Sequence, residues 1–285
     1  MSASAFPSFW GAVGLFLFSQ VVALLVATGL EALGLSLMIA EDVAMVAGYG
    51  AALAVCALRV RRRVADRLFL RGAPPGTLLV VPVTILGLLL LQGLFSAALE
   101  ALWPVPEWFE SFYGGLFEGS ATRVFMRVAV LAPVGEELLV RGAFLSAFVL
   151  RYGAVRGSVL SAVLFALMHA NPWQAVPALT AGLVFAWWTL RTGSLVPALL
   201  GHVLGNGLVV ALELWPEWFD AGPLAGALGL SLPVRGVLGA VLLLAGISGA
   251  RRLFPQPVAY HGRTDLQERT PTLGEERWLD DRHDG

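Results

Sequence analysis

The sequence predicts an all-α polytopic membrane protein with about eight transmembrane helices. Three features support this fold class: 57% of the 285 residues are hydrophobic, only 14% are charged, and the mean hydropathy is +0.76. Soluble domains carry about 25% charged residues, so this chain lacks the polar surface that a water-facing globule of its size needs. Long apolar runs then predict membrane-spanning helices.

Eight apolar runs are candidates for these helices. The first, 9–30, carries no charge and no basic residue precedes it. It is too long for the core of a signal peptide, so we expect it to remain in the membrane as the first span. The eight runs are 9–30, 43–58, 77–99, 124–150, 157–170, 173–190, 194–212 and about 231–250.

The charges of the loops alternate along the chain. Arginines follow the second, fourth, sixth and eighth runs, and acidic residues follow the first, third and seventh. Arginine is retained on the cytoplasmic side of short loops. The pattern therefore predicts a multi-pass integral protein, which we place in a bacterial inner membrane, with both termini in the cytoplasm. Arg123 and Arg235 are the exceptions.

The chain divides into four predicted regions. Residues 1–120 form an N-terminal transmembrane region of three spans and an outer interfacial loop, and 121–213 form the core that carries the unusual polar residues. Residues 214–250 hold an interfacial loop and the last span. Residues 251–285 contain six arginines and seven acidic residues with scattered Pro and Gly, which predicts a disordered cytoplasmic tail.

Charge and cysteine content exclude several classes of function. The net charge is −1 and the basic clusters lie beside apolar runs, so we expect no nucleic-acid partner. Cys56 is the single cysteine, which rules out a disulfide framework and a thiolate metal cluster. Membrane lipid is the expected surrounding.

Three charged residues lie near the middle of the run 124–150. Inserting an ionised side chain at the centre of a membrane costs about 2.5 to 3.5 kcal/mol. The presence of Glu136, Glu137 and Arg141 there therefore suggests a specific role. They share an arc of about 140° on one helix face, whereas Arg127 points to the opposite face. Glu137 and Arg141 are spaced for an ion pair. Glu136 then has no local counter-charge, which favours a general base; the alternative is a salt bridge that only joins helices.

Two further motifs place polar side chains in later apolar runs. His169 ends Phe165-x-x-x-His169, and His202 with Asn206 forms His202-x-x-x-Asn206. Each could be merely structural, through an interfacial or interhelical hydrogen bond. Together with Glu136 they offer a base to activate water, imidazoles to position water or bind a metal, and amide and imidazole N–H groups for an oxyanion. The motifs of zincins and serine hydrolases are missing from the sequence.

In this order, E-E-x-x-x-R, F-x-x-x-H and H-x-x-x-N resemble the three motifs of the CPBP family, the CAAX proteases and bacteriocin-processing enzymes also called the Abi domain. The resemblance covers residues 123–212. It implies an intramembrane endopeptidase whose catalytic core, 121–213, surrounds a membrane-embedded catalytic cavity. It also implies roles for six residues: Glu136 activates water, Glu137 and Arg141 support it, and His169, His202 and Asn206 complete the catalytic group.

The resemblance predicts hydrolysis of a peptide bond in a membrane-associated protein or peptide, but it does not identify the substrate. The alternative is an ion or proton-coupled transporter or channel that uses the Glu, Arg and His residues as a relay. Asn206 favours the protease, because an oxyanion site needs its amide and a relay does not. Zinc bound by Glu136, His169 and His202 is possible; the favoured mechanism requires no cofactor.

Overall fold

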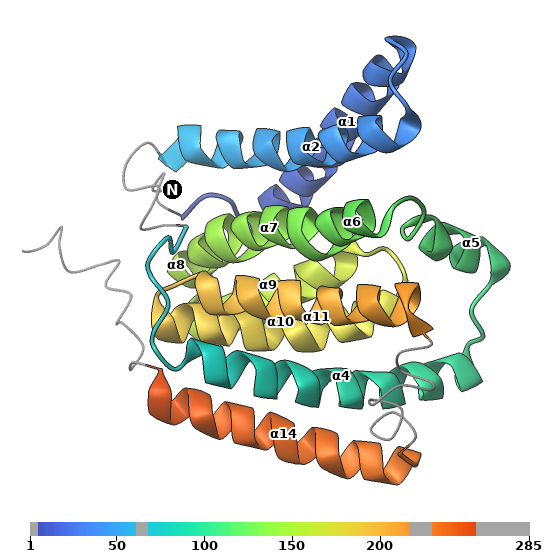
Figure 1. Cartoon of the computed structure of the whole chain (residues 1–285). Helices are drawn as coiled ribbons and strands as arrows, with labels where there is room; N and C mark the ends of the chain where they lie inside the picture. Colours follow the sequence, from blue (N-terminus) through green and yellow to red (C-terminus); the bar gives the residue numbers. More distant parts are fainter. Residues whose placement is uncertain (1–4, 61–67, 217–229, 255–285) are drawn as a thin grey trace, which may run out of the picture.

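The computed structural model describes residues 5–60, 68–216 and 230–254, and within these ranges the regular secondary structure is entirely helical. Each of the eight apolar runs overlaps one helical segment, which confirms the all-α prediction. These are α1 (Phe9–Ala32), α2 (Leu37–Val60), α4 (Thr77–Leu102), the continuous segment 121–152, α9 (Ala154–Met168), α10 (Pro172–Thr192), α11 (Val196–Leu214) and α14 (Leu232–Leu253). The short helix α5 (Glu107–Gly115) follows α4 (Figure 1).

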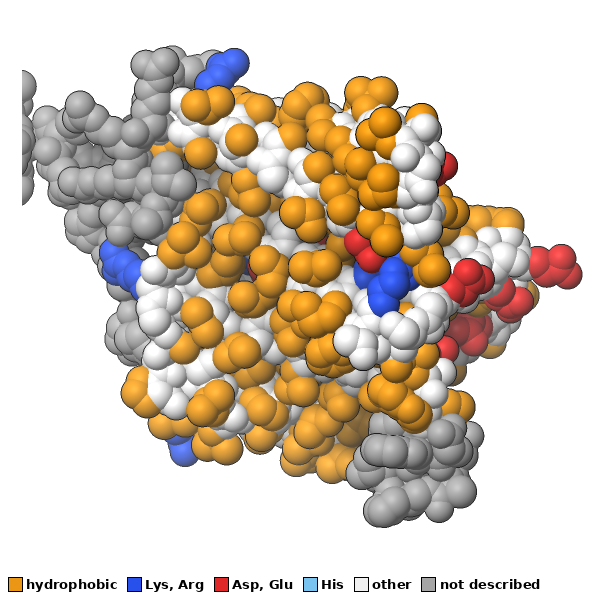
Figure 2. Space-filling view, turned by 45° about the horizontal axis from the view of Figure 1, so that its top comes forward, with side chains coloured by type: hydrophobic (Ala, Val, Ile, Leu, Met, Phe, Trp, Pro, Cys, Tyr) orange, Lys and Arg blue, Asp and Glu red, His pale blue; other side chains and the backbone are white. Residues whose placement is uncertain are grey.

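Five of the described helices, α1, α2, α4, α11 and α14, are long and apolar enough to cross a membrane. Their outer faces are also apolar: Leu24, Leu78 and Leu244 are 63%, 80% and 63% exposed. Figure 2 shows this surface as largely hydrophobic between the two ends of the bundle. A surface of this kind suits lipid rather than water. The chain is thus an integral membrane protein, and a total of eight spans stays a prediction.

Small residues allow α1 and α2 to pack closely as an antiparallel hairpin. Every fourth residue of α2 is small and buried, namely Ala40, Ala44, Gly48, Ala52 and Cys56. A Cβ atom at Gly48 would overlap the Ser19 carbonyl of α1. Close helix packing of this kind replaces the hydrophobic effect inside a membrane. Helix α2 also contacts residues 132–145 of the neighbouring helical segment 121–152.

The opposite side of the bundle is built on α4, which packs along α14 and also contacts α10 and α11 (Figure 1). Glycines again permit the approach, since a Cβ atom at Gly246 of α14 would overlap Thr84 of α4. Ile85 of α4 joins Phe185 and Trp188 of α10 in one buried cluster. These contacts hold α10 and α11 in place beside the segment 121–152.

The segment 121–152 is one continuous helix that changes register. It consists of α6 (Ala121–Val124), the π-helix η2 (Phe125–Leu131), α7 (Ala132–Glu137), the π-helix η3 (Leu138–Leu145) and α8 (Ser146–Tyr152). Pro133 follows the first π segment. Proline lacks an N–H and crowds the preceding turn, and the wider π turn accommodates both effects. The apolar pattern predicted the helix but not its two π segments.

Most charges outside the three sequence motifs separate to the two ends of the bundle. One end, called here the arginine end, contains the last residues of α2, α8, α10 and α14, the first residues of α9 and the residues before α4. Its arginines are Arg59, Arg71, Arg151, Arg156, Arg191, Arg251 and Arg252. An acidic end contains Glu41, Asp42, Glu100, Glu107, Glu110, Glu118 and Glu213, and also the exceptions Arg123, Arg127 and Arg235. In Figure 2 the acidic side chains gather at one end of the molecule. This arrangement is the one that alternating loop charges predict for a polytopic protein.

One ion-pair cluster lies at the acidic end, between α2 and the helix 121–152. Arg123 Nε lies 3.0 Å from Asp42 Oδ2, and Arg127 Nη1 lies 2.9 Å from Glu41 Oε2. Arg127 therefore faces α2 beside Arg123. It does not contact Glu136, Glu137 or Arg141, although Glu136 also contacts α2 through Tyr49. The exceptional location of Arg123 is explained, because its charge is balanced by a carboxylate.

One predicted boundary needs correction. Helix α14 continues to Leu253, so the tail predicted from residue 251 cannot begin before 254. The Arg251 and Arg252 side chains are exposed on the last turn of this helix. Cationic residues suit that position because the carbonyl end of a helix carries partial negative charge. The predicted disorder of 255–285 lies outside the described residues.

Candidate active site

The Glu137 carboxylate, completely buried at the end of α7, joins two helices of the bundle. Its Oε1 atom accepts a hydrogen bond of 2.9 Å from Arg141 Nη1, in η3. The same oxygen lies 2.9 Å from His202 Nδ1, in α11. The first contact follows from the i, i+4 spacing, whereas the second links residues 65 positions apart in the chain. Glu137 thus fixes the orientation of His202 as well as pairing with Arg141.

The contact with Glu137 decides which nitrogen of His202 carries the proton. A carboxylate can only accept, so Nδ1 must donate. In the neutral ring Nε2 is then an acceptor, and it lies 3.6 Å from Glu136 Oε2. This distance is too long for a direct hydrogen bond. Two acceptors therefore lie side by side, and one donor molecule, such as water, could bind both only from a position beside them.

Glu136 is the more accessible of the two carboxylates, with 17% of its side chain exposed. Its Oε1 atom accepts a hydrogen bond of 3.3 Å from the hydroxyl of Tyr49, on α2. Sequence reasoning left Glu136 without a partner on its own helix and did not single out Tyr49. Neither a motif nor a spacing marks this tyrosine, since it only interrupts an apolar run.

Arg141 is completely buried and lies against aromatic rings as well as Glu137. Its guanidinium carbon is 4.2 Å from the centre of the Phe165 ring and 5.4 Å from that of Phe185. Such stacking stabilises a cation away from water. Within the described residues, Arg141 Nε and Nη2 and Glu137 Oε2 have no hydrogen-bond partner. The rings therefore supply part of the stabilisation that hydrogen bonds give elsewhere.

Phe165 brings both motif histidines to one place. Its ring packs edge-on against His169 at 5.1 Å and against His202 at 5.6 Å between centroids. His169 caps the C-terminal end of α9, and its Nδ1 lies 2.9 Å from the Phe165 carbonyl oxygen. That oxygen is an acceptor, so Nδ1 donates and Nε2 of the neutral ring stays available. The F-x-x-x-H motif thus positions two imidazoles around one ring.

Asn206 binds a backbone carbonyl that the helix leaves free. Its amide nitrogen donates a 2.9 Å hydrogen bond to the Val128 oxygen in η2. In the π register the donor for Val128 would be residue 133, and Pro133 has no N–H. Asn206 replaces this missing donor. Its amide still has a second hydrogen, which is the one available for the predicted oxyanion contact.

The predicted zinc ligands are not gathered in the structure. Among the described residues, no three His, Cys, Asp or Glu side chains are placed to hold a metal ion. His169 hydrogen-bonds to its own helix, and His202 donates to Glu137. Both contacts use Nδ1, so each histidine keeps Nε2, and zinc binding by Glu136, His169 and His202 stays a prediction.

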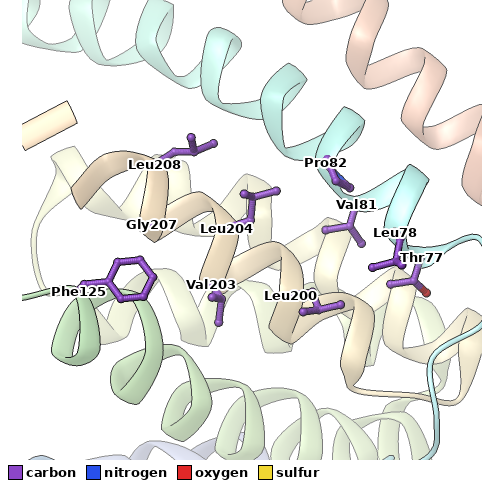
Figure 3. Close-up of a pocket in the computed structure, with 10 residues that line it drawn as sticks. All are labelled: Thr77, Leu78, Val81, Pro82, Phe125, Leu200, Val203, Leu204, Gly207 and Leu208. Carbon is purple, nitrogen blue, oxygen red and sulfur yellow. The ribbon is translucent and has the colours of Figure 1, made fainter. Parts of the chain in front are cut away.

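An apolar groove of about 380 Å³ lies between α4, η2 and α11. Figure 3 shows Leu78 and Pro82 of α4 opposite Leu204 and Leu208 of α11, with Phe125 at one side. The lining contains none of the six motif residues. A second hollow near Trp173 does not contain them either. A catalytic cavity at Glu136 stays a prediction.

Comparison with known proteins gives one match. Residues 118–208 match the family model described as type II CAAX prenyl endopeptidase Rce1-like. All six motif residues lie in this segment, whereas Tyr49 lies outside it. No curated protein and no solved structure matches the chain. The match confirms the CAAX-protease resemblance of the three motifs and gives no support to the transporter alternative.

Proposed function

We propose that the protein is an intramembrane endopeptidase, because residues 118–208 match the family model of Rce1-like type II CAAX prenyl endopeptidases. It hydrolyses a peptide bond of a membrane-associated protein or peptide, using water activated by Glu136. The observation that carries this proposal is the pair of acceptors, Glu136 Oε2 and His202 Nε2, that lie side by side, 3.6 Å apart, near the buried Glu137.

In the proposed mechanism, one water molecule donates its two hydrogens to Glu136 Oε2 and His202 Nε2. Glu137 holds the imidazole in the tautomer that leaves Nε2 free, as a carboxylate does for a histidine in other hydrolytic sites. Glu136 removes one proton while the water oxygen attacks the carbonyl carbon of the substrate. The C=O double bond opens, and its oxygen becomes the oxyanion of a tetrahedral intermediate.

Breakdown of the intermediate uses the same proton. The oxyanion re-forms the carbonyl, the C–N bond breaks, and Glu136 returns the proton to the departing amine nitrogen. The free amide hydrogen of Asn206 donates to the oxyanion, an interaction of the kind that stabilises such charge in other hydrolases. His169, which packs on the same Phe165 ring as His202, provides a second imidazole at the substrate.

The function is tested by comparing the membrane proteomes of cells that express the wild type or Glu136→Gln. We expect new protein termini, from one or a few membrane-anchored substrates, only in cells with the wild type. Because the substitution removes the base while keeping the shape of the side chain, expression and membrane insertion should be equal. Identical sets of termini in both cell lines would contradict the proposal.

We further propose that the reaction needs no metal ion. The support is chemical: asparagine, a poor zinc ligand, is a good donor to an oxyanion. Purified protein should keep its turnover after thorough chelation and hold less than stoichiometric zinc by elemental analysis. Loss of turnover on chelation and its recovery with added Zn²⁺ would reverse this proposal, as would zinc content that falls in His169→Ala and His202→Ala.

The charge separation supports an orientation with the arginine end in the cytoplasm and both termini on that side, as in a bacterial inner membrane. The test places one cysteine at each end in a Cys56→Ser background. Ser111 on α5 and Gly72 before α4 are both exposed. We expect an impermeant maleimide to label Ser111→Cys in intact cells and Gly72→Cys only after permeabilisation. The reverse pattern would overturn the orientation.

A further inference from the structure

We propose that Tyr49, contributed by α2, is a positioning residue that holds the Glu136 carboxylate for water activation. This inference rests on the proposed function. Its basis is the hydroxyl of Tyr49, which donates to Glu136 Oε1 at 3.3 Å while the other oxygen of this carboxylate faces His202. The family match begins at residue 118, so the active site would extend beyond the segment that carries its motifs.

The two oxygens of Glu136 have separate surroundings. Oε2 is directed toward His202 Nε2, where the water is proposed to bind, and Oε1 toward Tyr49. A carboxylate on a flexible side chain rotates unless one oxygen is held, and such rotation would move the base away from the water. A hydrogen bond to Oε1 from a rigid aromatic side chain prevents it without occupying Oε2.

Packing around Tyr49 is specific to its ring. Gly135 directly precedes Glu136, and a Cβ atom there would overlap Tyr49 Cδ2 and lie 2.8 Å and 2.9 Å from Cγ and Cε2. The absence of a side chain at 135 therefore gives the ring its place against α7. The ring also packs on the buried cluster that contains Val140 and Phe144. These contacts fix the direction of the hydroxyl.

Anchoring of α2 makes this contact possible. The ion-pair cluster joins Asp42 to Arg123 and Glu41 to Arg127. It lies seven to eight residues before Tyr49 on α2 and nine to thirteen residues before Glu136 on its helix. The α1–α2 hairpin is thus attached to the helix 121–152 at two levels. Only the second level reaches a group proposed to take part in the reaction.

The first test removes only the hydroxyl. In Tyr49→Phe we expect kcat to fall about 10- to 100-fold, which is the rate factor that corresponds to losing one hydrogen bond to a charged group. KM and the melting temperature should be unchanged. Tyr152→Phe is the matched control, because the Tyr152 hydroxyl accepts a bond of the same 3.3 Å length from the Phe9 N–H. The control should keep the wild-type kcat. A Tyr49→Phe enzyme with wild-type kcat would overturn the inference.

The second test displaces the ring instead. Gly135→Ala should lower kcat about as much as Tyr49→Phe does, whereas Gly50→Ala, whose Cβ atom would meet nothing within 4 Å, should not. In a Tyr49→Ala background the added methyl of Gly135→Ala has room, so it should cause no further loss of kcat. An equal loss from Gly135→Ala in both backgrounds would show that the ring is not the group displaced, and would contradict the inference.

A spectroscopic readout separates this inference from the proposed function. The infrared carboxylate band of Glu136 is isolated as the difference between the wild type and Glu136→Gln, and the same difference is recorded in a Tyr49→Phe background. We expect the band to shift when the hydroxyl is removed. An unshifted band overturns the inference while leaving the protease proposal intact. Equal turnover in the wild type and Glu136→Gln overturns the proposed function and, with it, the role assigned to Tyr49.

Discussion

The turnover of purified Glu136→Gln is expected to be about 10²- to 10⁴-fold lower than that of the wild type, which is the rate factor that a general base contributes. The amide cannot accept a proton from water at neutral pH, yet it has nearly the same volume as the carboxylate. It also keeps an oxygen that can accept from the Tyr49 hydroxyl. Turnover of a membrane-anchored peptide in detergent, measured beside the melting temperature, gives the comparison.

The matched control is Glu118→Gln, the same chemical change at an exposed residue of the acidic end. Its Arg123 contact uses the backbone oxygen, so the substitution leaves that hydrogen bond in place. It should have wild-type turnover and melting temperature. Full activity in Glu136→Gln would remove Glu136 from the mechanism. A low melting temperature in Glu136→Gln would instead mean that the carboxylate is needed for folding.

Glu137→Ala is expected to destabilise the protein strongly. It leaves the buried Arg141 guanidinium without its carboxylate and the His202 Nδ1 proton without its acceptor. Removing one partner of a buried ion pair costs about 3 to 5 kcal/mol. In a protein of this size that corresponds to a fall of about 10 °C in melting temperature. Thermal unfolding in detergent measures it.

Glu137→Gln is the informative comparison, because its side-chain oxygen can still accept from Arg141 or His202. We expect a smaller loss of stability than in Glu137→Ala, together with a clear loss of turnover, since a neutral amide orients the imidazole less firmly. A melting temperature of Glu137→Ala equal to that of the wild type would show that Arg141 does not depend on this carboxylate.

Local spacing predicted one contact of the candidate site. The ion pair of Glu137 with Arg141 depends only on one helical turn. The eight helical segments were likewise predicted, because apolar runs bounded by charges are a property of the chain itself. Patterns of this kind need no knowledge of which helices become neighbours.

Contacts between distant helices could not be predicted in the same way. The link between His202 and Glu137 and the hydrogen bond from Tyr49 to Glu136 depend on how α11 and α2 pack against α7. The partner of Asn206 depends on a π register, in which Pro133 leaves the Val128 carbonyl free. Hydrophobic periodicity carries no information about either. Whether the predicted zinc ligands meet at one point likewise depends on the packing of three helices, which residue types do not determine.

The ion-pair cluster has a consequence for the energetics of the protein in an energised membrane. A membrane potential acts on every charge within its field, with about 2.3 kcal/mol per elementary charge for each 100 mV crossed. Arg123 and Arg127 alone would couple the active-site helix to this voltage. With Glu41 and Asp42 beside them, the four charges sum to zero. Changes of voltage should therefore exert little net force on this cluster, and the attachment of the α1–α2 hairpin to the helix that carries Glu136 should be the same in energised and de-energised membranes.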